Sequence, residues 1–270
     1  MAVKSEWIRF GEHTGYFAYP EGAKSPLPGV VVIQEAWGVN DNIEDIARRL
    51  AAAGYAALAP DLFAVRGVRP EPLRRERVAE AVAFMNALPP QTRFDPAARD
   101  KALAALPPPE RLRIDETWKS IFSSPSERSA MIVPLRAAFA CLRTERPETK
   151  GARVGCVGFC MGGGLSALLA CEEPEISAAA VFYGNSPPED KIASIGCPVL
   201  AFYGGNDQRV NTGIPAFEEA MRRNGKTFER HVYEGVNHGF FNDTGPSYDV
   251  AAARDSFARL LTFFARNLAG

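Results

Sequence analysis

The chain has 270 residues, of which 46% are hydrophobic and 23% charged, and its formal net charge is −1. This composition is typical of a globular protein in water with enough apolar material for a core. A net charge near zero supplies no field that would attract nucleic acid or an anionic membrane, so we expect neither as a partner.

Targeting, metal and disulfide signals are weak. The first ten residues carry Lys4, Glu6 and Arg9 rather than the apolar core of a secretory signal, and the rest of the chain has no run of about 18 apolar residues. The five cysteines are scattered, without CxxC spacing, which favours reduced thiols in the cytoplasm. The three histidines do not cluster with cysteines, so we expect no metal site of the zinc kind.

Apolar strands alternate with amphipathic helices along most of the chain. An example is the helix predicted over 42–53, which has acidic residues early, Arg48 and Arg49 late, and Gly54 beyond its end. Such alternation indicates an α/β fold, a mostly parallel sheet covered by helices on both faces. We predict strands over 30–34, 55–59, 153–159, 178–183, 198–203 and 227–233, and helices over 42–53, 161–171, 214–224 and 248–268.

Residues 64–128 interrupt this alternation, although we expect residues 1–270 to form a single domain. Residues 70–88 have a helical pattern, and we expect Pro89, Pro90, Pro96 and Pro107–Pro109 to break the rest of the segment. The segment is too long for a simple connection. It is either a connection between strands that is enlarged by surface helices or a partial lid over a site.

The strongest local motif is Gly158-Phe159-Cys160-Met161-Gly162, at the junction of a predicted strand and helix. A nucleophile on such a sharp turn needs small neighbours, and the next backbone N–H points toward a developing oxyanion. The motif usually has serine at its centre, and cysteine stands there here. The alternatives are a buried structural cysteine beside a turn and a phosphate-binding turn. The phosphate alternative is weak because no Gly-Lys-Ser/Thr comes after the turn.

Two further groups have the chain order of a catalytic triad. Asp207 follows the predicted strand 198–203, and His238 follows the strand 227–233. Nucleophile, acid and histidine in this order, each after a strand, are typical of α/β-hydrolases. Because the carboxyl ends of parallel strands meet at one edge, we expect both side chains to lie near Cys160.

Other candidates fit less well. His231 falls inside an alternating strand, and His13 lies in a hairpin-like N-terminal stretch without a motif. Asp243 comes after His238 in the chain, which is the wrong order, and Asp61 ends an early strand where it more simply caps a turn.

Several segments together resemble the dienelactone hydrolases (carboxymethylenebutenolidases). The resemblance implies an α/β-hydrolase fold and hydrolysis of a small ester or lactone without a cofactor, through a thioester formed on Cys160. It assigns Glu35 to control of the resting thiol, and the N–H groups of Ala36 and Met161 to the oxyanion hole. The segments are Gln34-Glu35-Ala36-Trp37-Gly38-Val39-Asn40, Ala59-Pro60-Asp61-Leu62-Phe63, Gly158-Phe159-Cys160-Met161-Gly162-Gly163, Gly204-Gly205-Asn206-Asp207 and Gly235-Val236-Asn237-His238-Gly239-Phe240.

The expected substrate pocket departs from the family pattern. The family holds a substrate carboxylate with two arginines, but Asn242 stands where one of them is expected after His238. Arg74 and Arg77 are candidates for the other. The aromatic residues Trp37, Phe63 and Phe240 are candidates for an apolar wall.

Two alternatives remain open at this stage. The same triad would also serve a different acyl substrate, such as a thioester or an activated amide. A non-catalytic binding scaffold could retain the fold, although all triad positions are occupied and both glycines beside Cys160 are present. The sequence does not define an oligomeric state.

Overall fold

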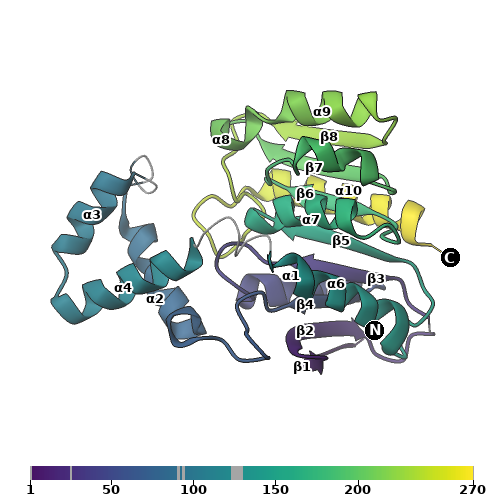
Figure 1. Cartoon of the computed structure of the whole chain (residues 1–270), viewed down its shortest axis with the longest axis horizontal. Coiled ribbons are helices and arrows are strands. Elements are labelled where there is room, and N and C mark those ends of the chain that lie inside the picture. The colour runs from purple at the N-terminus through teal and green to yellow at the C-terminus, as the bar shows by residue number, and fades with distance from the viewer. Residues whose placement is uncertain (1, 25, 90–91, 93–94, 123–129, 270) are drawn as a thin grey trace.

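The computed structural model describes residues 2–24, 26–89, 92, 95–122 and 130–269. Its centre is an eight-stranded sheet in the order β1-β2-β4-β3-β5-β6-β7-β8 (Figure 1). The pairs β1·β2 and β2·β4 are antiparallel, and all other pairs are parallel. The strands are β1 (Val3–Phe10), β2 (His13–Pro20), β3 (Gly29–Ile33), β4 (Ala56–Pro60), β5 (Val154–Phe159), β6 (Ala179–Phe182), β7 (Val199–Gly204) and β8 (Phe228–Tyr233).

Helices cover both faces of this sheet. On one face, α1 (Asp41–Ala52) and α10 (Val250–Leu268) contribute to one hydrophobic cluster. On the other, α6 (Ile132–Ala140), α7 (Met161–Glu172) and α9 (Ile214–Arg223) contribute to a second cluster. The strands between them are buried on both sides, which explains their continuous apolar sequences. Short elements complete this part: η2 (Cys141–Glu145), η3 (Glu189–Ser194) and α8 (Gln208–Asn211).

The predicted α/β architecture is confirmed, and the strands and helices predicted outside the insertion begin and end within two residues of the observed ones. The first helix begins slightly earlier than expected because Asn40, rather than a later residue, is its N-cap. The Asn40 side chain accepts a hydrogen bond from the N–H of Ile43 at 3.2 Å. The hairpin-like N-terminal stretch is the β1–β2 hairpin, and His13 begins its second strand.

Between β4 and α6 the described part of the insertion is helical. It contains η1 (Glu71–Leu73), α2 (Arg75–Ala87), α3 (Pro96–Ala104) and α4 (Pro108–Ile121), which form a lobe beside the sheet (Figure 1). The expectation that these prolines break the segment is wrong for three of them. Pro96, Pro108 and Pro109 each occupy the first turn of a helix, where the missing N–H has no intrahelical partner to lose. Pro90 lies outside the described residues.

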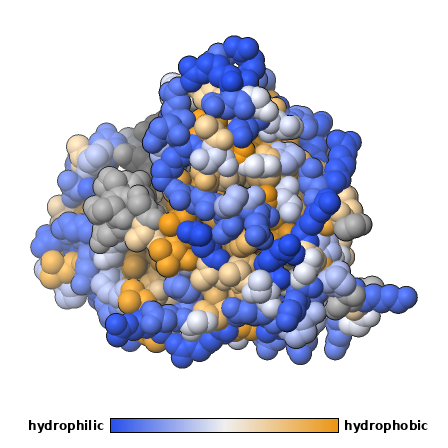
Figure 2. All heavy atoms as spheres, turned by 45° about the vertical axis from the view of Figure 1, so that its right-hand side comes forward, coloured by the Kyte–Doolittle hydropathy of each residue, from blue (hydrophilic) through white to orange (hydrophobic). Residues whose placement is uncertain are grey.

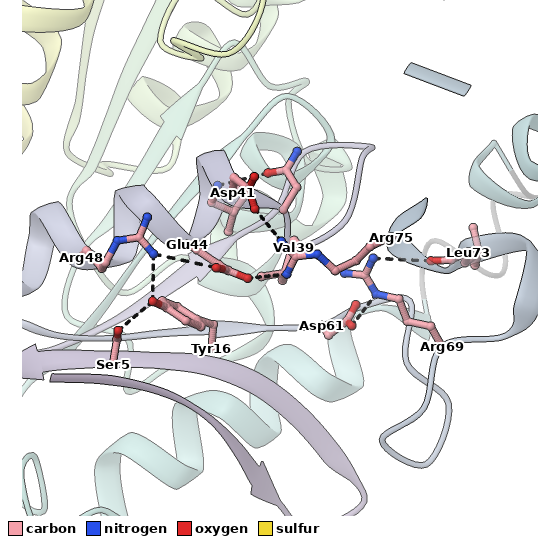
Figure 3. Close-up of polar contacts among 12 residues, drawn as sticks. Ser5, Tyr16, Val39, Asp41, Glu44, Arg48, Asp61, Arg69, Leu73 and Arg75 are labelled. Atoms are coloured by element: carbon pink, nitrogen blue, oxygen red, sulfur yellow. Dashed lines mark hydrogen bonds and ion pairs between the residues drawn. The ribbon is translucent and has the colours of Figure 1, made fainter. Parts of the chain in front are cut away.

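Ion pairs join this lobe to α1. Arg75 donates to Asp41 at 2.7 Å and also pairs with Glu44 (Figure 3). Within the lobe, Arg113 donates to Glu80 at 2.6 Å. Arg75, Asp41 and Arg113 are exposed, whereas Glu44 and Glu80 are partly buried. Ion pairs with an exposed partner each contribute about 0–1 kcal/mol.

The two outermost strands, β1 and β8, carry polar residues on their exposed positions, with the exception of Trp7 on β1. Figure 2 shows a face on which hydrophilic residues predominate and hydrophobic residues lie in areas between them. The large hydrophobic side chains that are exposed among the described residues are Trp7, Val65, Val68, Leu112, Phe122, Val133, Tyr248 and Val250.

The first turn of α7 lies directly against the backbone of the sheet. A Cβ atom on Gly162 would stand 2.4 Å from the carbonyl oxygens of Ile33 and Gln34. A Cβ on Gly163 would stand 2.6 Å from the carbonyl oxygen of Phe182. Both distances are far below van der Waals contact, so glycine is required for this close approach.

We therefore expect Gly163→Ala to lower the free energy of unfolding by roughly 1–3 kcal/mol, as for other overpacked sites. Gly164→Ala is the matched control, because its Cβ would meet nothing closer than 3.3 Å and alanine favours a helix. Urea unfolding followed by circular dichroism measures both. Equal stability of the two variants would contradict the packing argument.

Candidate active site

Three sequence-predicted side chains come from the carboxyl ends of three parallel strands. Cys160 directly follows β5, Asp207 follows β7 after a short turn, and His238 lies in the loop after β8. Strands β5, β6, β7 and β8 are consecutive neighbours in the sheet. The fold therefore brings these side chains to one edge, as expected from their positions in the chain.

The backbone at Cys160 has an unusual conformation. Its φ is 55° and its ψ is −116°, a region that residues with a Cβ rarely adopt. Its N–H donates to the carbonyl of Phe182 at 3.0 Å, which ties the turn to β6. A Cβ on Gly158 would stand 1.8 Å from the carbonyl oxygen of Gly162, so the turn closes tightly around the cysteine. The strained turn therefore presents the half-buried thiol at the start of α7.

His238 and Asp207 form a close pair. Nδ1 of His238 lies 2.5 Å from Oδ2 of Asp207, and Asp207 is buried. Nε2 of His238 is buried without a hydrogen-bond partner among the described residues. Since Nδ1 is engaged, Nε2 is the ring nitrogen that remains for the Cys160 thiol, which lies near enough to influence the pKa of the imidazole. The tautomer with the proton on Nδ1 follows from the carboxylate partner.

The electrostatic environment favours a protonated imidazole. Burial lowers the pKa of His238, but the hydrogen bond with Asp207 and the interaction with the Cys160 sulfur outweigh it and raise the pKa to about 10. The imidazole can therefore hold a proton at neutral pH.

Glu35 lies in the loop after β3 and is buried, with 3% exposure. Its Oε1 accepts from the Tyr183 hydroxyl at 3.1 Å, and its Oε2 accepts from Nδ2 of Asn242 at 2.7 Å. Burial raises the pKa of the Glu35 carboxyl, and the hydrogen bonds and the nearby His238 only partly oppose this.

The direction of the Asn242 amide follows from its other contacts. Its Oδ1 accepts from the backbone N–H of Thr244 at 3.0 Å and from the Thr244 hydroxyl at 2.7 Å. Nδ2 is then the end that faces Glu35, so Asn242 donates to the carboxylate. Asn242 is itself buried and engaged, and it offers Glu35 a neutral donor rather than a cation.

Four other predicted residues lie close together at the loop after β3. Ala36, Trp37, Phe63 and Met161 belong to one hydrophobic cluster, which also includes Val78 and Ile121 of the lobe. The Trp37 ring packs edge-on against Phe122 with centroids 6.1 Å apart. The lobe thus contacts the loop that carries Ala36.

A cavity of about 910 Å³ lies between the lobe and the sheet. Phe63, Leu73, Leu112 and Met131 are among its apolar lining residues, whereas Cys160 and His238 do not line it. Phe63, Leu73 and Met131 also belong to the cluster that contains Ala36, so this cavity and the loop after β3 share contact residues.

The remaining pocket candidates, Arg74, Arg77 and Phe240, do not line this cavity. Arg77 pairs with Glu71 at 2.5 Å and with Glu116 at 3.0 Å, within the lobe. Arg74 is exposed and precedes α2. Phe240 has no exposed surface and packs in the core, with its ring 5.3 Å from that of Tyr183.

Two residues near the site were not singled out from the sequence. Tyr183 ends the predicted strand 178–183, so its place at the carboxyl edge was a usable signal. It has a positive φ of 40°, and its ring lies edge-on to His238 at 4.9 Å. Arg69, in the insertion, contacts the loop after β3, and nothing in the local sequence marks this.

The competing candidates have local partners instead. His231 contacts Glu229 at 2.8 Å on β8, and Asp243 pairs with Arg49. The carboxylate of Asp61 accepts from the N–H of Phe63 at 3.1 Å, the turn contact expected for it. Among the described residues, no group of three or more histidine, cysteine or acidic side chains is arranged to hold a metal ion. No helix in the described ranges is both long and apolar enough to cross a membrane.

Known proteins resemble the chain along nearly its full length. The model of the dienelactone hydrolase family matches residues 14–268. A protein of Saccharolobus solfataricus, provisionally assigned as a carboxymethylenebutenolidase, is 34% identical over 258 residues, covering 93% of each chain. The crystal structure of a provisionally assigned dienelactone hydrolase from Klebsiella pneumoniae is 26% identical, with a TM-score of 0.66 over 98% of this chain and all of that one.

A more distant structure matches the fold alone. The acylaminoacyl peptidase of Pyrococcus horikoshii is 14% identical, and its TM-score is 0.62 over 99% of this chain and 42% of that one. The parallel sheet and the tight strand–helix turn at Cys160 define the fold of an α/β-hydrolase. Within that class, the chain belongs to the dienelactone hydrolase family. It is accordingly a hydrolase that acts on esters or lactones.

The His238–Asp207 pair yields a prediction for nuclear magnetic resonance. We expect His238 to titrate near pH 10, and Asp207→Asn to lower its pKa by at least about one unit, because the variant removes a charged partner. Asp243→Asn is the matched control, since that carboxylate pairs with Arg49. Imidazole ¹⁵N shifts recorded against pH measure the change.

The same raised pKa has a consequence for stability. A protonated His238 adds to the free energy of unfolding, because its pKa is higher in the folded chain than the ordinary value of 6.5. This contribution is fully present below about pH 6.5 and is lost as pH rises through about 10. The stability advantage of the unsubstituted chain over Asp207→Asn should shrink across that range. An unchanged His238 titration in Asp207→Asn would refute the assigned contact.

Proposed function

We propose that the chain hydrolyses a small ester or lactone with Cys160 as nucleophile and His238 as base, oriented by Asp207. The observation that carries this proposal is the pairing of Nδ1 of His238 with buried Asp207 while Nε2 is left for Cys160. This is the arrangement that nucleophile, base and orienting acid require.

The proposed reaction has two stages. The Cys160 thiolate attacks the ester carbonyl, and the tetrahedral intermediate collapses to a thioester while the leaving alkoxide takes a proton from the His238 imidazolium. Neutral His238 then removes a proton from water, whose oxygen attacks the thioester. The carboxylic acid product leaves, and the thiolate–imidazolium pair is restored. The reaction consumes one water and needs no cofactor.

The oxyanion hole in this proposal consists of the N–H groups of Ala36 and Met161. In the described part of the chain neither N–H donates to a backbone carbonyl, and Met161 is the first residue of α7, where the helix dipole favours negative charge. Such a donor contributes roughly 3–4 kcal/mol to transition-state stabilisation.

Glu35 is proposed to control the resting thiol. A buried carboxylate beside His238 and Tyr183 opposes the development of a negative charge on the Cys160 sulfur, while it also attracts the imidazolium. Tyr183 supports this arrangement because it donates to Glu35 and its own pKa is raised by burial and by the neighbouring Glu35 and Cys160. It therefore remains a neutral donor.

We also propose that residues 1–270 form one domain and that the protein works in the cytoplasm. The cluster shared by the lobe and the loop after β3 supports a single unit. It leaves open whether the insertion also serves as a partial lid. All five cysteines are unpaired, which suits a reducing compartment.

The nucleophile is tested by turnover of p-nitrophenyl acetate and of a dienelactone. We expect Cys160→Ala to lose at least about a hundredfold in kcat, because no acyl-enzyme can form. Cys197→Ala is the matched control, since that thiol is buried away from the three site residues. Rapid mixing should also show a burst of p-nitrophenolate, with one acetyl group on Cys160 by mass spectrometry. Full activity of Cys160→Ala would overturn the assignment of Cys160 as nucleophile, whereas no turnover of either ester by the unsubstituted protein would favour a binding scaffold.

The charges around Glu35 predict the kind of ester preferred. Since Asn242 is neutral and already engaged, we expect p-nitrophenyl butyrate to exceed the p-nitrophenyl monoester of succinate in kcat/KM by about tenfold. The two esters have similar size and differ by a carboxylate. Asn242→Arg should reduce this preference, and Tyr248→Arg, at an exposed position in the same loop between β8 and α10, serves as control. A preference of the unsubstituted protein for the succinate ester would contradict the charge argument.

A further inference from the structure

Arg69 is a buried cation that the proposed reaction does not use. It lies between β4 and η1, and its side chain is 9% exposed. Its Nε donates to Oδ2 of Asp61 at 2.6 Å, and the Asp61 side chain is 4% exposed. A buried ion pair of this kind has a considerable desolvation cost, which is offset only when further hydrogen bonds satisfy both groups.

Those further hydrogen bonds join three segments of the chain (Figure 3). Nη2 of Arg69 donates to the carbonyl of Val39 at 2.9 Å, and Nη1 lies 3.5 Å from the carbonyl of Leu73. The guanidinium carbon lies 5.6 Å from the centre of the Phe63 ring. Arg69 therefore connects the loop after β3, the loop after β4 and the beginning of the lobe.

The loop after β3 is held at both of its ends. At the first end, Oε1 of Gln34 accepts from the N–H of Leu62 at 3.1 Å. At the second end, Arg69 binds the Val39 carbonyl and packs against Gly38, where a Cβ would stand 3.0 Å from Nη2. Gly38 has a φ of 78°, so the loop turns sharply there. Glu35 and Ala36 lie between these two points.

We propose that Arg69, oriented by Asp61, is a positioning residue that sets the backbone of the loop after β3 and thereby aims the Ala36 N–H at the oxyanion. This rests on the proposed function. Arginine suits the role because its planar group donates to a carboxylate and to carbonyls in several directions at once, whereas lysine presents a single compact charge. A misplacement of about 1 Å at such a site can cost on the order of a hundredfold in rate.

The test compares two reactions of Cys160 in Arg69→Lys. Ester hydrolysis passes through an oxyanion, whereas alkylation by iodoacetamide displaces iodide at a saturated carbon and needs no oxyanion hole. We expect kcat for p-nitrophenyl acetate to fall between about tenfold and a hundredfold with KM nearly unchanged. The alkylation rate of Cys160 should stay within about twofold.

Arg75→Lys is the matched control. Arg75 belongs to the same set of ion pairs between the lobe and the core, but it contacts the α1 side chains Asp41 and Glu44 and not the loop after β3 (Figure 3). Its substitution should leave both reactions within about twofold. If Arg69→Lys does not fold, Asp61→Asn provides the second variant. It removes the charge that orients Arg69 while keeping the side-chain shape, and the same selective loss is expected.

Two results would overturn the positioning role of Arg69. Unchanged hydrolysis in both Arg69→Lys and Asp61→Asn would overturn the positioning role. A parallel fall in hydrolysis and alkylation would also overturn it, since it would show a general effect on the thiol or on folding. Failure of the proposed function is distinguishable, because Cys160→Ala would then remain active whatever Arg69 does.

Discussion

The arrangement of this protein depends on the contact between the first turn of α7 and the backbone of β3 and β6. Gly162 and Gly163 allow the helix to lie against carbonyl oxygens of both strands, and no larger residue fits there. This contact places Cys160 in its strained conformation and brings the start of α7 beside the loop that carries Glu35. The relative positions of the Cys160 thiol, the N-terminus of α7 and the Glu35 carboxylate therefore follow mainly from this backbone packing.

Much of this could be predicted because the signals are local. The strands are apolar runs bounded by turns, and the cysteine turn is a contiguous motif of five residues. Asp207 and His238 required one additional step, the rule that parallel strands end at a common edge. The structure brings these two into contact, which sequence spacing alone could not measure.

The features that escaped prediction depend on contacts between distant segments. Pro96 and Pro108 are an exception with a local cause, since each stands in the first turn of its helix and Asp95 caps the helix that Pro96 begins, although a proline in sequence equally signals an end. Asn242 was expected to face a substrate, but the turn with Thr244 directs its amide to Glu35, more than 200 residues earlier in the chain. Arg69 likewise becomes informative only once the loops after β3 and β4 are seen side by side.

The two edges of the sheet have a further consequence. Strand β1 presents Lys4, Glu6 and Arg9 at exposed positions, and β8 presents Glu229 and Arg230. An unpaired strand edge is a template on which another chain can add by backbone hydrogen bonding, and charged side chains make such addition costly. The sheet can therefore end at both sides without recruiting strands from neighbouring molecules. This resistance to fibrous association is independent of the chemistry at its carboxyl edge.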